Sequence, residues 1–213
     1  MSAGVESVLR AGARVLGCEL GDAQTGRLLA YLEMLGRWNK VYNLTAVRDP
    51  AEMLTHHVLD SLAVIPPLRR HTEGRALRLL DVGSGGGLPG VVLAVCCPEL
   101  AVSCVDAVGK KTAFVQQVAG ALRLTNLQGL HARVESVPAP FDVITSRAFA
   151  SLPDFTRWSA GALAEQGVWM AMKGKYPQDE IQALPPEVEV FHVEHLIVPG
   201  LDAERCLIWL RRH

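Results

Sequence analysis

Apolar residues along the chain change their spacing near residue 75. Before it they recur at the three- and four-residue intervals of amphipathic helices, first in Val5, Val8, Leu9 and Ala13 and then in Leu28, Leu32, Leu35 and Trp38. A third helix should begin with Asp49 as its N-cap and Pro50 in its first turn, and it should end before Pro66. Residues 1–75 are therefore expected to form an N-terminal helical extension.

From residue 76 onward, short apolar runs typical of buried strands alternate with helical segments. The runs cover residues 78–82, 101–105, 127–134, 141–145, 168–172, 189–197 and 206–211. This alternation predicts an α/β fold with a mainly parallel sheet. The last two runs are joined by too few residues for a crossover helix, so they should pair antiparallel at the sheet edge. Residues 76–213 are expected to form one compact domain.

The first apolar run leads into glycines at alternate positions, which let the backbone turn sharply and approach a ligand closely. Two ligand classes are compatible with them. The G-x-G-x-x-G pattern of a dinucleotide site is matched by Gly85, Gly87 and Gly90. The pattern of a methyl-donor site, an acid followed by G-x-G-x-G, is matched by Asp81, Gly83, Gly85 and Gly87. Asp81 would repel a pyrophosphate and attract the ammonium group of a sulfonium amino acid, so the spacing favours the methyl donor.

Further candidate residues follow the later strands, at the end of the sheet where ligands lie in such folds. Asp106 has the offset from the glycines at which an acid binds a ribose diol, a feature that both cofactor classes share. Val134 and Glu135 are placed to contact an adenine. Arg147 is expected to bind a carboxylate or a phosphate, because the sequence offers it no obvious structural partner. A local RNA-binding patch is predicted from Lys110, Lys111, Lys173 and Lys175.

Composition restricts the possible partners. The net charge of −1 excludes a global basic field, so any RNA contact must be local. The five cysteines are odd in number and lack metal-binding spacing, which fits a reducing compartment. His56, His57 and Asp60 are the candidate metal ligands in the helical segment. Only His56 and Asp60 share a helix face, and two ligands make a poor site, so we expect no metal site. No stretch resembles a leader or a membrane span. We therefore expect a cytoplasmic protein that does not bind a membrane and has no obligate protein partner.

The residues after the fourth apolar run restrict the methyl acceptor. They contain no Asn/Asp-Pro-Pro-aromatic run, with which amino-methylating enzymes bind adenine or cytosine, and no cysteine that could attack a pyrimidine ring. Guanine N7 carries an exposed lone pair and loses no proton on methylation. Positioning of donor and acceptor would therefore supply most of the catalysis, with no need for a general base.

Five segments carry a resemblance to a known family: Trp38–Leu62, Leu79–Gly90, Asp106–Lys111, Arg133–Ser136 and Phe141–Leu152. They are similar to the bacterial 16S ribosomal RNA guanine-N7 methyltransferases, also called glucose-inhibited division protein B. The resemblance implies a Rossmann-like class I methyltransferase sheet and S-adenosylmethionine as the methyl donor. It also implies one guanine in the decoding region as the acceptor, and hence 16S rRNA or a small-subunit precursor as the partner.

The same resemblance assigns roles to individual residues. Gly83 and Leu88 would contact the donor, Asp106 its ribose, and Val134 and Glu135 its adenine. Arg147 would be the catalytic residue and contact the donor or the guanine. Two other functions remain open from the residues alone. They are an NAD-dependent oxidoreductase that uses the G-x-G-x-x-G pattern, and a non-catalytic RNA-binding or assembly factor with a vestigial cofactor pocket.

Overall fold

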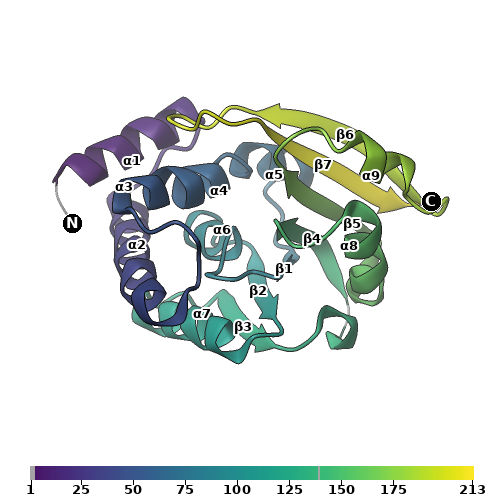
Figure 1. Ribbon diagram of the computed structural model, residues 1–213, viewed down its shortest axis with the longest axis horizontal. Coiled ribbons are helices and arrows are strands. Elements are labelled where there is room, and N and C mark those ends of the chain that lie inside the picture. Colours follow the sequence, from purple (N-terminus) through teal and green to yellow (C-terminus); the bar gives the residue numbers. More distant parts are fainter. Residues whose placement is uncertain (1–2, 139) are drawn as a thin grey trace.

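The computed structural model describes residues 3–138 and 140–213 (Figure 1). Helices make up the first third of the chain, as the apolar spacing predicts. They are α1 (Ala3–Val15), α2 (Asp22–Tyr42), α3 (Pro50–Met53), the π-helical η1 (Leu54–Leu59), α4 (Asp60–Leu62) and α5 (Ile65–Thr72). Asp49 caps α3 as predicted, since its Oδ1 accepts hydrogen bonds from the backbone N–H groups of Ala51 and Glu52.

The second part of the chain forms a seven-stranded sheet. Its strands are β1 (Arg78–Val82), β2 (Ala101–Asp106), β3 (Leu127–His131), β4 (Phe141–Arg147), β5 (Leu163–Lys173), β6 (Val188–Leu196) and β7 (Arg205–Arg212). They lie in the order β3-β2-β1-β4-β5-β7-β6. The first five are parallel, whereas β7 is antiparallel to both β5 and β6. The predicted mainly parallel sheet with an antiparallel edge pair is therefore confirmed.

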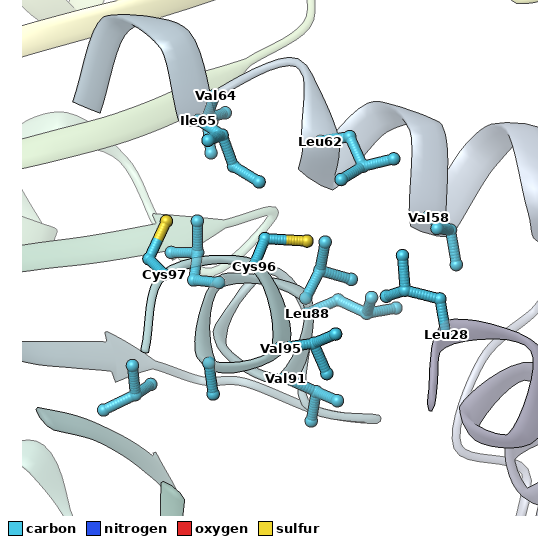
Figure 2. Close-up of a cluster of buried hydrophobic side chains, with 14 of the residues drawn as sticks. Leu28, Val58, Leu62, Val64, Ile65, Leu88, Val91, Val95, Cys96 and Cys97 are labelled. Atoms are coloured by element: carbon cyan, nitrogen blue, oxygen red, sulfur yellow. The ribbon is translucent and has the colours of Figure 1, made fainter. Parts of the chain in front are cut away.

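Short helical elements connect the strands. They are α6 (Gly90–Cys96), α7 (Gly109–Ala121), the 3₁₀ turn η2 (Val134–Ser136), α8 (Leu152–Ser159), the 3₁₀ turn η3 (Ala160–Ala162) and α9 (Gln178–Gln182). Alternate strand residues point to opposite faces of the sheet and pack in two separate cores. Leu79 and Val143 belong to one core, and Leu80 and Ile144 belong to the other. In the first core, α6 packs beneath the helices of the extension, where Leu62 and Val95 are among the buried residues (Figure 2).

The extension also contacts the loop after β1 directly. The Tyr31 hydroxyl in α2 donates a buried hydrogen bond of 2.6 Å to the Gly86 carbonyl. The Trp38 ring packs at a tilt of 53° against Phe114 of α7, with ring centroids 5.3 Å apart. Helix α2 therefore contacts the glycine loop, residues 83–87, directly. The division into domains at residue 75 stays a prediction. No helix within residues 3–138 and 140–213 has the length and apolar character needed to cross a membrane.

The third predicted helix ends at Leu62, before Pro66, as expected, and both prolines lie in the first turn of a further helix, α5, where a missing N–H costs nothing. Two predicted strand boundaries are wrong by three or more residues, for identifiable reasons. The third strand ends at His131, and Val134 belongs to the turn η2. The fifth strand begins earlier than expected, at Leu163, because the exposed Glu165 and Gln166 interrupt the apolar pattern without ending the strand.

Candidate functional site

Two pockets meet at the glycine loop, at the carboxyl ends of the parallel strands. The first, which we call the Asp106 pocket, has a volume of about 420 Å³, and its lining includes Val82, Gly83, Asp106, Lys111, Val134, Glu135 and Phe149. The second, the Arg147 pocket, has a volume of about 460 Å³, and its lining includes Thr45, His57, Asp60, Gly85, Leu88, Arg147, Lys173 and Arg205. Gly83 and Ala148 line both pockets, so a single elongated ligand can occupy the two.

Gly83 has a backbone conformation that favours glycine. Its φ is +65°, and a Cβ built on it would lie 2.3 Å from Cδ2 of Phe149. Asp106 holds the loop from the side of β2. Its Oδ2 accepts a hydrogen bond of 3.1 Å from the Gly85 N–H, and its Oδ1 accepts one of 2.9 Å from the Val108 N–H. The Asp106 carboxylate thus fixes the backbone between the two pockets and still lines the first one.

Asp81 lies beneath the glycine loop and does not line either pocket. Its side chain is fully buried, and its Oδ2 accepts a hydrogen bond of 2.8 Å from the Gly90 N–H at the start of α6. Desolvation raises the pKa of Asp81 to about 7, although the Gly90 N–H and Arg147 act in the opposite direction. The contact shown by the structure is therefore with the loop-to-helix backbone. The predicted contact with the ammonium group of the donor stays a prediction.

Arg147, at the end of β4, has a structural partner that the sequence did not reveal. Its Nη1 donates to Oδ2 of Asp60 at 3.0 Å and to the His56 carbonyl at 2.7 Å. The expectation that Arg147 lacks a structural partner is wrong, because Asp60 is supplied by the helical extension 87 residues earlier. The Arg147 side chain remains about 20% exposed and lines the second pocket, so it is held in place with part of its surface open to a ligand.

Asp60 joins a second arginine to this group. Its Oδ1 accepts a hydrogen bond of 2.8 Å from Nε of Arg205 in β7, and its side chain is only 2% exposed. Two guanidinium groups around one carboxylate leave this part of the pocket with a net positive charge, which favours an anionic ligand group. Sequence reasoning missed Arg205, because a lone arginine at the start of a strand carries no motif.

His57 extends the network from Arg147 to the loop after α2. Its Nδ1 lies 3.4 Å from Nη2 of Arg147, and its Nε2 lies 2.8 Å from Oγ1 of Thr45. Because a guanidinium only donates, Nδ1 must accept, and the proton of the neutral ring must be on Nε2. Burial, together with the Arg147 charge, lowers the pKa of His57 to about 4. His57 is therefore a neutral link between Arg147 and Thr45.

The four lysines of the predicted RNA patch do not share one environment. Lys110 and Lys175 are exposed. Lys111 lies 3.4 Å from Oδ2 of Asp106 in the first pocket. Lys173 pairs with Glu180 at 2.8 Å and donates to the Ala150 carbonyl at 2.9 Å. The structure thus separates two surface lysines from two that line the pockets, and their contact with RNA stays a prediction.

Three observations indicate that the two pockets suit S-adenosylmethionine. A Cβ built on Gly85, which lines the Arg147 pocket, would meet no atom closer than 3.9 Å, so the space beside this backbone is open to a ligand. The Asp106 pocket combines two carboxylates with the apolar Val134 and Phe149, which suits the hydroxyls of a ribose and the faces of a purine. The Arg147 pocket offers cationic groups suited to a carboxylate.

Comparisons with known proteins identify the family of the chain. Residues 24–208 match the model of the GidB family, described as rRNA small subunit methyltransferase G. Ribosomal RNA small subunit methyltransferase G of Acidovorax ebreus is 65% identical over 215 residues, covering 97% of this chain and 95% of the relative. The protein of the same name from a Polaromonas species is 65% identical over 212 residues, covering 98% and 94%.

Solved structures of lower identity show the fold. Magnesium protoporphyrin IX methyltransferase of Synechocystis, with bound SAM, superimposes with a TM-score of 0.62 at 13% identity, covering 90% of this chain and 98% of its own. TrmN of Thermus thermophilus gives a TM-score of 0.57 at 19% identity, covering 75% and 53%. The predicted Rossmann-like methyltransferase fold is thereby confirmed. Because the family model matches most of the chain and relatives at 65% identity span nearly all of it, the chain belongs to the GidB family, that of rRNA small subunit methyltransferase G.

Proposed function

We propose that the protein transfers a methyl group from S-adenosylmethionine to N7 of a guanine in the decoding region of 16S rRNA. Family membership supports a methyltransferase that acts on small-subunit RNA. The finer choice of acceptor atom rests on one observation about the Arg147 pocket. Its two most buried titratable side chains, His57 and Asp60, are both engaged by Arg147, so neither is free to remove a proton, whereas the half-buried imidazole of His56 also lines the pocket. Guanine N7 has a lone pair and needs no proton removed.

We assign the adenosine part of the donor to the Asp106 pocket. The Asp106 carboxylate would accept hydrogen bonds from the ribose hydroxyls, because each of its oxygens retains acceptor capacity beyond the backbone N–H that it already binds. Val134 would cover one face of the adenine, and Glu135 would accept from its amino group. The backbone of Gly83 and Gly85, together with Leu88, would contact the part of the donor that lies between the two pockets.

The Arg147 pocket would hold the amino-acid part of the donor and the acceptor guanine. S-adenosylmethionine supplies, when bound, a methyl group on a positively charged sulfur. Arg147 would orient the anionic or carbonyl groups that enter the pocket, while Asp60 and His57 restrict the rotamers of its guanidinium. Catalysis by this chain would then consist of holding two reactants in line and excluding water, which supplies a large share of a rate enhancement.

The partner in this proposal is 16S rRNA or a precursor of the small subunit, met in the cytoplasm and without an obligate protein partner. The test uses donor labelled in its methyl group, with small subunits from a strain that lacks this gene as the acceptor. We expect label at N7 of a single guanine in the decoding region. Label at another atom, or none on the RNA, would refute the proposal.

A further inference from the structure

A third pocket, outside the site described above, lies between α2 and the segment that leads into α3. Its volume is about 420 Å³. The floor is formed by Leu32, Gly36 and Met53, and the rim by three exposed cations and one exposed acid: Arg37, Lys40, Arg48 and Glu33. We call it the α2–α3 pocket. An apolar floor below a cationic rim is the surface that a nucleobase with its phosphates requires.

The charges of the rim favour a polyanion. Arg37 pairs with Glu33, one helical turn earlier in α2. Within residues 3–138 and 140–213, neither Lys40 nor Arg48 forms an ion pair with an acidic side chain. The nearby Asp49 carboxylate is directed at the first N–H groups of α3, where it serves as a cap. Two cations at the rim are thus left to hold phosphates.

The α2–α3 pocket and the Arg147 pocket lie on either side of the loop that joins α2 to α3. Thr45 and Val47 of this loop line the Arg147 pocket, whereas Arg48 lines the α2–α3 pocket. The buried Asn39 fixes the loop between them, since its Nδ2 donates to the Val47 carbonyl at 3.0 Å and its Oδ1 accepts from the Thr45 N–H at 2.8 Å. An RNA strand that leaves the Arg147 pocket therefore needs to cross only this loop to reach the next one.

We propose that the α2–α3 pocket binds a nucleobase of the substrate RNA that flanks the target guanine, while Lys40 and Arg48 hold the adjoining phosphates. The size agrees with this assignment, because the Asp106 pocket, assigned above to an adenosine, has the same volume of about 420 Å³. The inference rests on the proposed function, since it needs an RNA substrate in the Arg147 pocket. It predicts that the protein reads one position of the RNA beside the methylated one.

The test blocks the α2–α3 pocket with a larger side chain on one of its lining residues. A Cβ at Gly36 would meet no heavy atom within 4 Å, so Gly36→Leu places a side chain in the pocket without a backbone clash. Gly26→Leu is the matched control, because Gly26 lies in the same helix with the same open surroundings and does not line the pocket. We measure KM and kcat for small subunits that lack the methyl mark, and the affinity for S-adenosylhomocysteine by calorimetry.

We expect Gly36→Leu to raise the KM for the subunits at least tenfold, with kcat and the affinity for S-adenosylhomocysteine within twofold of the control. A KM equal to that of Gly26→Leu overturns the inference and leaves the proposed function intact. Failure of the wild-type protein to methylate the subunits overturns the proposed function, and the inference with it.

A second measurement covers the case in which Gly36→Leu does not fold. The double substitution Lys40→Ala and Arg48→Ala removes only exposed side chains, and we expect the same rise in KM with a smaller dependence on salt. Small-subunit RNA that carries 4-thiouridine should crosslink to peptides containing residues 32–40 or 48–53. Crosslinks confined to peptides of the Arg147 pocket would show that the RNA does not reach the α2–α3 pocket and would overturn the inference.

Discussion

Replacing Asp60 by asparagine tests whether this carboxylate holds the site together. The substitution keeps the shape of the side chain and removes the charge between Arg147 and Arg205. The Asp60 side chain is 2% exposed, so the two guanidinium groups would lose their counter-ion in a place that water reaches poorly. The amide would also point its NH₂ group at one of the two arginines, which can only donate.

The size of the effect follows from the burial of the three groups. Removing one partner of a fully buried ion pair costs about 3–5 kcal/mol, because a charge is left without compensation. Arg147 and Arg205 are about 20% and 22% exposed, so they regain part of their hydration, and the lower end of that range applies. We expect a loss of about 3 kcal/mol, which lowers the melting temperature of a chain of this length by roughly 6–12 °C.

The assay is urea unfolding at pH 7.5, with thermal unfolding as a second measurement. Asp22→Asn is the control, because Asp22 is 98% exposed and forms a surface ion pair with Arg10. We expect the control to leave stability within the error of the measurement. If Asp60→Asn unfolds at the same urea concentration as the control, the Arg147–Asp60–Arg205 group does not stabilise the fold, and its role as the holder of Arg147 is refuted.

Three further predictions follow from individual residues. Gly83→Ala should abolish calorimetric binding of S-adenosylhomocysteine, because its Cβ would lie 2.3 Å from Phe149, whereas Gly120→Ala, with open surroundings in α7, should bind normally. The stability difference between wild type and His57→Gln should narrow by up to about 3 kcal/mol as the pH falls from 6.5 to 4. The lowered pKa of about 4 means that the stabilising contribution of His57 is present above its unfolded pKa and is lost below it. An equal difference in urea unfolding at both pH values would contradict this. Reversing the exposed Lys110 and Lys175 to glutamate should reduce the salt dependence of RNA binding, measured by filter retention, and an unchanged slope would place the RNA contact elsewhere.

The sequence predicted the features that depend on local pattern. The order of helices and strands, the glycine loop, the family and the methyltransferase fold are confirmed. The oxidoreductase alternative is excluded by family membership. The third glycine of its G-x-G-x-x-G pattern, Gly90, is explained by packing, because a Cβ at this position would lie 2.4 Å from Sγ of Cys104. What the pattern did not predict is which side chains already have partners. Asp81 is buried against α6, and Lys173 is paired with Glu180, and although these partners lie only nine and seven residues further along the chain, the strand pattern does not specify how the intervening loops fold back.

The helical extension is more than a support for the sheet, because it supplies part of the site. Asp60 and His57 come from its helices, Arg147 from β4 and Arg205 from β7. The Asp60 bonds span 87 residues to Arg147 and 145 residues to Arg205, so neither bond can form until the extension has packed on the completed sheet. Arg147 therefore has its final orientation only in the fully folded chain. We infer that a sheet domain lacking residues 1–75 could retain the Asp106 pocket, but it would lack the groups that orient Arg147.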